Sequence, residues 1–256
     1  MFTLNASYTE HGKKHTVATF DNDAFLLSLQ EEKGRITASL TAKKAIRMNC
    51  FSLDQERFFT EEDRFLANGY QSWSTTMEYK RSDTVKGYFK PADLLRLGAY
   101  LASAVGDYTF TTYEEPGIFH SETFTYLRKQ GQNRILLYGS KTERQGFTIF
   151  EVDMYRDRFS IRKDLDGLEL KAGQVYPVLD VAVIEDEYDA AFDRYFFDFC
   201  GFQKPKVDRL AGYTSWYNYF RNINEDIILR DLNHLDAFSD LTEIFQIDDG
   251  YSKVGD

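Results

Sequence analysis

The stretch FTIFEV at residues 147–152 alternates with a period near two, which is typical of a half-buried β-strand. Three more runs share this period, at residues 35–41 (RITASLT), 159–162 (FSIR) and 178–184 (VLDVAVI). Turn signals separate such runs at residues 32–34 (EKG), 130–133 (QGQN) and 164–167 (DLDG). Many short strands at roughly regular spacing predict an antiparallel β-sandwich.

Composition limits the classes of function. The chain has 256 residues, 43% of them hydrophobic, which is enough for one large core or two smaller ones. Its net charge of −10 argues against a nucleic-acid partner, because phosphate-binding surfaces need clustered Lys and Arg. The aromatic fraction of 16% fits either a β-rich core or sugar stacking, and composition alone favours the core. We see no membrane-spanning run and no signal peptide, and expect a cytoplasmic protein.

The cysteines and histidines give no sign of a disulfide framework or a metal site. Cys50 and Cys200 are the two cysteines, and we expect both to be buried free thiols. The histidines are scattered along the chain, at His11, His15, His120 and His234. We therefore expect no metal and no cofactor.

A change of period marks the end of the first domain. Apolar residues then recur at three- and four-residue steps, as on one face of a helix, at Tyr188, Ala191, Phe192, Tyr195, Phe196 and Phe199. Gly201 follows at the position of a C-terminal cap. The sequence thus predicts a sandwich domain over residues 1–205, ending in a linker helix at about 186–200. A short helix is also expected at residues 92–104.

Residues 206–256 predict a strand, a helix and a second strand. The predicted strands are residues 210–216 and 243–247, and Asn224 is placed to cap the helix between them. Ile228, Leu232, Leu235 and Phe238 form its expected buried stripe. The short apolar second strand is typical of one buried on both faces, so we expect a parallel βαβ unit. DDGY at residues 248–251 follows that strand, where α/β proteins bind ligands.

Four motifs resemble glycoside hydrolase family 36, the microbial α-galactosidases. They are GYTSWYNYF at residues 212–220, FQIDDGY at 245–251, GD at 255–256 and NGYQSWS at 68–74. That family opens its barrel with G-W-x-S-W-Y, continues with F-x-I-D-D-G/A-Y/W and G-D-W, and carries N-x-W-Q-S-W in its sandwich. The resemblance covers roughly residues 60–256, and Tyr70 and Tyr213 stand where the family commonly has Trp.

The resemblance implies a mainly β protein, with a β-sandwich followed by the first βαβ unit of a truncated TIM-type barrel. It implies the N-terminal portion of a retaining α-galactosidase that hydrolyses terminal α-galactosides. Asp248 and Asp249 would bind the galactose hydroxyls at C4 and C6, and Trp216 and Trp73 would line the pocket. Further aromatic candidates are Tyr70, Tyr217 and Tyr251.

Asp248 and Asp249 are not expected to be the catalytic pair. Retaining hydrolysis needs two carboxyls about 5–5.5 Å apart on opposite sides of the scissile bond. Adjacent strand residues point to opposite faces and do not straddle such a bond. In the resembling family, the nucleophile and the acid/base are aspartates on later strands, so we expect them beyond Asp256. The chain alone should then be inactive.

The sequence leaves several alternatives open. Without the resemblance, the two aspartates are also explained by a strand-end turn that caps backbone N–H groups, and the two tryptophans by core packing. The sandwich alone fits a non-catalytic carbohydrate-binding module. A related glycosidase or transglycosylase, for example one acting on α-N-acetylgalactosaminides, fits the same motifs. The full-length protein could also form a homo-oligomer.

Overall fold

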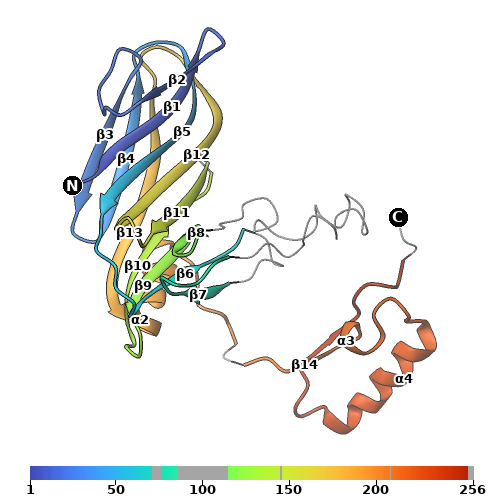
Figure 1. Ribbon diagram of the computed structural model, residues 1–256. Helices are drawn as coiled ribbons and strands as arrows, with labels where there is room; N and C mark the ends of the chain where they lie inside the picture. The colour runs from blue at the N-terminus through green and yellow to red at the C-terminus, as the bar shows by residue number, and fades with distance from the viewer. Residues whose placement is uncertain (71–75, 86–114, 145, 208, 253–256) are drawn as a thin grey trace. The chain divides into compact units, whose positions relative to one another are not determined.

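The chain forms two compact units, residues Met1–Phe202 and Gln203–Asp256, in the computed structural model (Figure 1). The structure describes residues 1–70, 76–85, 115–144, 146–207 and 209–252. The expected helix at residues 92–104, Trp73 and the GD motif at 255–256 lie outside these described residues.

The first unit is mainly β, with two antiparallel sheets that form a sandwich-like body, as the sequence predicted (Figure 1). The six-stranded sheet has the order β2 (Lys13–Val17), β1 (Thr3–Glu10), β5 (Ile46–Glu56), β12 (Arg158–Leu170), β11 (Phe147–Asp153) and β8 (Ile118–Glu122). The seven-stranded sheet has the order β3 (Phe25–Glu32), β4 (Arg35–Ala42), β13 (Val175–Glu187), β10 (Arg134–Ser140), β9 (Phe124–Lys129), β6 (Asp63–Ala67) and β7 (Met77–Tyr79).

Two of the three predicted turns join neighbouring strands, and the third does not. Residues 33–34 connect β3 to β4, with Gly34 at φ +83°, and residues 130–133 connect β9 to β10. Residues 164–167 instead form an irregularity inside β12, where the register with β5 shifts between Asp164 and Leu168. Asp166 and Gly167 both have positive φ there. Because β5 pairs with β12 on both sides of the shift, the turn-like residues produce a bulge and not a reversal.

The seven-stranded sheet is buried on both faces at its centre. In β10, Leu136 and Tyr138 face the core between the sheets, while Ile135 and Leu137 face a second apolar cluster on the outside. In β13, Val181 and Val183 likewise face the core between the sheets, while Ala182 and Ile184 face the outer cluster. A strand covered on both faces needs apolar residues at successive positions, which explains these nearly continuous runs.

A helical segment covers the outer face of this sheet. It comprises α2 (Tyr188–Asp193) and a π-helical turn at Arg194–Phe199, so it starts two residues later than predicted because β13 continues through Glu187. Tyr195 is buried against Gly139, where an added Cβ would lie 2.3 Å from the tyrosine ring. The Tyr195 hydroxyl donates a hydrogen bond to the Ser140 carbonyl at 2.6 Å. The predicted apolar face is therefore the face that packs on the sheet.

Cys50 and Cys200 are free thiols, as expected, but both are half-buried and not buried. Cys200 packs against the outer apolar cluster. Partial burial still raises the pKa of both thiols above the usual value.

The second unit confirms the predicted parallel pairing. Its elements are β14 (Gly212–Thr214), α3 (Trp216–Tyr219), α4 (Glu225–Leu235), a 3₁₀ turn at Asp236–Phe238 and β15 (Ile244–Gln246). β14 and β15 are parallel, with Gly212 opposite Ile244 and Thr214 opposite Gln246. Asn224 caps α4 as predicted, because its side-chain oxygen accepts the N–H of Ile227 at 2.9 Å. The first strand is shorter than predicted, since the backbone enters a helical conformation at Ser215.

The predicted burial in the second unit is wrong. None of the residues of α4 is buried, and Leu232 and Phe238 of the expected stripe are 44% and 55% exposed. Ile244 and Ile247, expected to be buried on both faces, are also exposed. Among the described residues, two three-residue strands, α4 and the short α3 offer too little surface to enclose these side chains.

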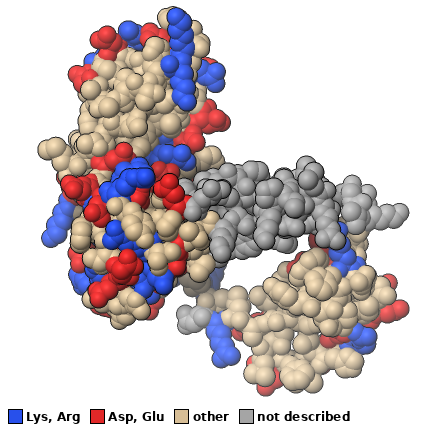
Figure 2. Space-filling view, viewed as in Figure 1, with Lys and Arg blue, Asp and Glu red and all other residues tan. Residues whose placement is uncertain are grey.

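Charged side chains of both signs are interspersed on the face of the sandwich drawn in Figure 2. Among the described residues, no helix has the length and apolar character needed to cross a membrane.

Candidate functional site

The C-terminal ends of β14 and β15 bring two of the sequence motifs together. The strands are parallel and in register, so the residues that follow them emerge at the same edge. Ser215 and Trp216 follow β14, while Asp248 and Asp249 follow β15 after one intervening residue. We take this edge as the candidate site.

Ser215 connects the two strand ends directly. Its backbone N–H donates to the Gln246 carbonyl at 3.2 Å, and its hydroxyl accepts the N–H of Asp248 at 3.0 Å. Ser215 is the one buried residue among the described residues of the second unit. The position of Asp248 is therefore fixed by a contact to the neighbouring strand end.

Asp248 already uses part of its hydrogen-bonding capacity within the loop. Its carboxylate accepts the N–H of Asp249 at 2.8 Å and the side-chain amide of Gln246 at 3.0 Å. These local contacts are those expected of a strand-end turn. A carboxylate can accept about four hydrogen bonds, so Asp248 keeps capacity for a further donor.

Asp249 is the more open of the two aspartates. Its side chain is 62% exposed, and its Oδ2 lies 3.8 Å from Nη2 of Arg221, which is itself 60% exposed. An ion pair of this length between exposed groups is weak. The Asp249 carboxylate is thus the better placed of the two to accept hydrogen bonds from a ligand.

Gly250 lets the two loops of the site approach closely. It has φ +108°, and a Cβ added there would lie 2.7 Å from the Arg221 carbonyl oxygen. A residue with a side chain would meet both backbone strain and a collision. Ser215, Gly250 and Arg221 were not among the site residues predicted from the sequence; the first two lie inside the quoted motifs, and Arg221 gives no signal in the sequence.

The aromatic candidates of the second unit differ in exposure. Trp216 is half-buried and packs edge-on against Phe220, with ring centroids 5.3 Å apart. Tyr217 and Tyr251 are 83% and 77% exposed. Trp216 is therefore held in place by packing, whereas the two tyrosines lie open to solvent.

Tyr213, at one of the positions where the family commonly has Trp, has a structural role. Its ring stacks on Phe245 of the neighbouring strand, with centroids 4.7 Å apart, and its hydroxyl donates to Asp231 at 2.7 Å. Burial is the larger cause that raises the pKa of Tyr213 to about 12, and the bond to Asp231 is the next. The ring thus ties β14 to β15, and its hydroxyl ties β14 to α4.

The other two candidates belong to the sandwich. Tyr70 is 58% exposed and packs edge-on against Phe147 of β11, with ring centroids 5.3 Å apart. Asn68 anchors the chain just before it, because its N–H donates to the Ser121 hydroxyl at 2.8 Å and its side-chain amide to the Glu122 carbonyl at 2.9 Å. Trp73 lies outside the described residues.

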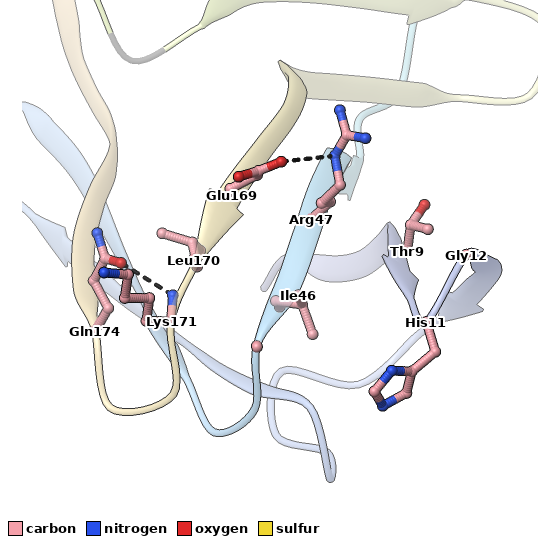
Figure 3. A pocket seen from close by; sticks show the side chains of 10 residues that line it. Thr9, His11, Gly12, Ile46, Arg47, Glu169, Leu170, Lys171 and Gln174 are labelled. Carbon is pink, nitrogen blue, oxygen red and sulfur yellow. Dashed lines mark hydrogen bonds and ion pairs between the residues drawn. The ribbon is translucent and has the colours of Figure 1, made fainter.

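A depression at one end of the sandwich is drawn in Figure 3. There Arg47 lies 3.8 Å from Glu169, and the N–H of Lys171 donates to the side chain of Gln174 at 3.1 Å (Figure 3). His11 contributes an exposed side chain from the turn between β1 and β2. Because most of these polar groups pair with one another, we assign the depression no role.

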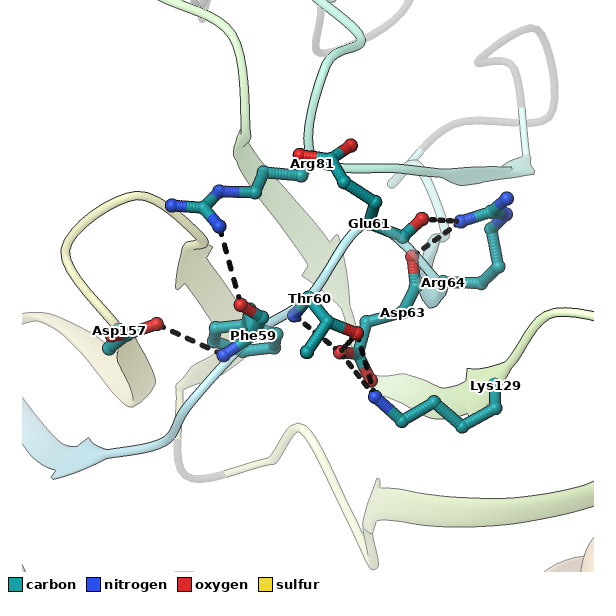
Figure 4. Close-up of polar contacts among 8 residues, drawn as sticks. All are labelled: Phe59, Thr60, Glu61, Asp63, Arg64, Arg81, Lys129 and Asp157. Carbon is teal, nitrogen blue, oxygen red and sulfur yellow. Dashed lines mark hydrogen bonds and ion pairs between the residues drawn. The ribbon is translucent and has the colours of Figure 1, made fainter.

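Asp63 lies in a polar cluster of the sandwich that serves structure (Figure 4). Its Oδ2 accepts hydrogen bonds from the Thr60 N–H at 2.7 Å and from Lys129 at 2.8 Å. Burial alone would raise the pKa of this carboxyl, but the bonds from Lys129 and Thr60 outweigh it and lower the pKa. The cluster fixes the start of β6 against β9.

Lys163 is a second enclosed ionisable group of the sandwich. Its side chain is 2% exposed, donates to the Thr148 hydroxyl at 2.8 Å and lies 3.6 Å from Glu143. Burial lowers the pKa of Lys163, and the nearby Glu143 carboxylate opposes this. Within the described ranges, no group of three or more His, Cys, Asp and Glu side chains is placed to hold a metal ion.

No protein-family model matches the chain, and a search of curated proteins gives no match. The resemblance to glycoside hydrolase family 36 therefore rests on the motifs in the sequence, and membership of that family stays a prediction.

Proposed function

We propose that this chain is the N-terminal portion of a retaining α-galactosidase, in which a β-sandwich precedes the first βαβ unit of a TIM-type barrel. The observation that supports this most is the parallel pairing of β14 and β15. It places Trp216 and the Asp248–Asp249 pair at the C-terminal edge of adjacent strands, which is where barrel enzymes bind their substrates.

The chemistry of this edge suits a sugar. Ionised carboxylates accept hydrogen bonds from hydroxyl groups, and bonds to a charged acceptor are strong and directional. Asp249 is open for this purpose, while Asp248 has two local bonds and capacity for another donor. In the resembling family the corresponding aspartates bind the C4 and C6 hydroxyls, and an axial C4 hydroxyl distinguishes galactose from glucose. Trp216 would line the same pocket.

Catalysis is proposed to depend on carboxylates outside residues 1–256. Asp248 and Asp249 are adjacent in the chain and bonded through the Asp249 N–H, so they cannot flank a glycosidic bond from opposite sides. We expect the 256-residue chain to release no aryl alcohol from an aryl α-galactoside. Robust release that depends on the purified chain would contradict this assignment.

Sugar binding by the chain gives a direct test. Methyl α-D-galactopyranoside and methyl α-D-glucopyranoside differ only at C4, and each can be titrated while backbone amide signals are followed by NMR. We expect the galactoside to shift the amides of residues 215–216 and 248–251 at lower concentration than the glucoside. Shifts confined to the sandwich would instead favour a carbohydrate-binding module, and equal effects of the two sugars would exclude a galactose-selective site.

Asp249→Asn is the sharpest variant for the same titration. The change keeps the shape and removes the charge, and a bond to a charged acceptor contributes roughly 1.5–3 kcal/mol, so binding should weaken about 10- to 150-fold. A longer polypeptide with the catalytic residues should lose kcat/KM by a similar factor. Asp240→Asn, at an exposed position of the same unit, is the matched control and should bind like the wild type. Unchanged binding beside a lower melting temperature would identify Asp249 as a turn residue.

A further inference from the structure

Ser215 lies between β14 and α3, and its backbone carbonyl cannot accept the hydrogen bonds of both elements. Its carbonyl accepts the N–H of Tyr219 at 3.1 Å, as the first bond of α3. In a parallel ladder that pairs Thr214 with Gln246, the same carbonyl would accept the N–H of Asp248. That N–H bonds to the Ser215 hydroxyl, at 3.0 Å. The side chain thus replaces the backbone acceptor that the helix has taken.

This replacement of a backbone acceptor by the Ser215 side chain matters because Asp248 is in contact with the other residues of the site. Its backbone is held by Ser215, its carboxylate accepts the N–H of Asp249, and the Asp249 carboxylate faces Arg221 at 3.8 Å. Gly250 then packs against the Arg221 backbone with no room for a Cβ. The hydroxyl of Ser215 is thus the first link of a series of contacts that sets both aspartates.

We propose that Ser215 is a positioning residue of the candidate site, whose buried hydroxyl holds the Asp248 backbone and so aims the carboxylates of Asp248 and Asp249. The role in sugar binding rests on the proposed function, whereas the contact itself does not. Ser215 acts through Asp248 and needs no contact with the sugar.

Three variants isolate the hydroxyl. Ser215→Ala removes it, and Ser215→Thr retains it. Thr214→Val is the matched control, because the buried Thr214 hydroxyl has no hydrogen-bond partner among the residues that the structure describes. Each is made in the 256-residue chain.

The first measurement is amide hydrogen exchange at Asp248, which needs no ligand. Loss of one hydrogen bond should speed the Asp248 exchange about tenfold in Ser215→Ala. Ser215→Thr and Thr214→Val should exchange like the wild type, and the amides of α4 should not change in any variant. A general loss of stability would instead speed exchange throughout the second unit.

The second measurement is the affinity for methyl α-D-galactopyranoside. Ser215→Ala should weaken binding about three- to tenfold, because the aspartates lose alignment while keeping their charge. Asp248 exchange that is unchanged in Ser215→Ala, or equally fast in Ser215→Thr, overturns the proposal whatever the sugar does. Faster exchange with unchanged affinity overturns the positioning role and leaves the proposed function intact. If the wild type does not prefer the galactoside over the glucoside, the proposed function fails and the positioning role with it, while the exchange data still decide the contact.

Discussion

The sandwich and the second unit carry similar apolar patterns but bury them to different extents. Phe159 of β12 and Phe150 of β11 are both 0% exposed. In the second unit Phe238 is 55% exposed, and the most apolar strand, β15, has no buried residue. The helix α2 and the π-helical turn lie on a sheet, whereas α4 has no buried side chain at all.

The difference teaches that an apolar pattern indicates which residues share a face, while burial requires a second layer. The sandwich supplies two sheets and a covering helix, so each apolar face meets another. In the described part of the second unit there are a single pair of strands, the 11-residue helix α4 and the short α3. Under the proposed function, further strands and helices of a barrel would cover its apolar faces.

Truncating one apolar side chain in each unit should show the largest difference in the free energy of unfolding. Phe159→Ala removes a fully buried ring and should lower the free energy of unfolding of the sandwich by about 3–5 kcal/mol. Leu232→Ala, at a position 44% exposed in α4, should cost less than about 1 kcal/mol. Denaturant unfolding, monitored in each unit by amide hydrogen exchange, measures both free-energy costs. Similar costs at the two sites would mean that the second unit has a core.

Lowering the pH should affect the stability of the sandwich and of the second unit differently, because their carboxylates differ in burial. The folded state lowers the pKa of Asp63, so the unfolded chain binds more protons near and below its usual pKa of about 4. The stabilisation from Asp63 is present above that value and is lost as the pH falls through the lower folded pKa. Asp63→Asn should therefore cost about 1–3 kcal/mol at neutral pH, and its difference from the wild type should shrink below about pH 4.

Melting temperatures between pH 3 and pH 7 provide the measurement for Asp63. The matched control is Asp249→Asn, whose exposed carboxylate should leave the melting temperature unchanged over this range. A constant difference between Asp63→Asn and the wild type at every pH would show that the Asp63 charge is not what stabilises the cluster.

The smallest expected effect is at the start of α4. Asn224→Ala removes the side-chain acceptor of the Ile227 N–H and should cost about 0.5–2 kcal/mol. With no buried residue in α4, the loss should appear as faster amide exchange over residues 225–235 and leave the sandwich unchanged. Asn233→Ala, at an exposed position in the same helix, is the control and should not speed exchange. Faster amide exchange in the sandwich of Asn224→Ala would contradict the difference drawn between the two units.

Much of the sandwich was predictable because its signals are local. Alternation, turn residues and the helical face from Tyr188 to Phe199 correspond to strands, turns and the covering helix. The segment at 164–167 was misassigned because its residues suit a reversal and a bulge equally. Only pairing of β12 with β5 on both sides of it decides between the two.

In the candidate site, the sequence indicated Asp248, Asp249 and Trp216 but not how they are held. The role of Ser215 depends on a helix that begins one residue after it and on a neighbouring strand 33 residues further along the chain. The exposure of Asp249 relative to Asp248 likewise follows from loop contacts that no local pattern encodes.

The sequence by itself determined the strand periodicity, the cap at Asn224, the order of the elements and the chemical character of the strand-end residues. These depend on near neighbours in the chain, where propensity and hydrogen bonding act over a few residues. The tertiary structure alone decided the sheet order, the bulge in β12, the half-burial of Cys50 and Cys200, and the exposure of the α4 face. These depend on which surfaces meet, and a surface is removed from water only when another part of the chain is there to cover it.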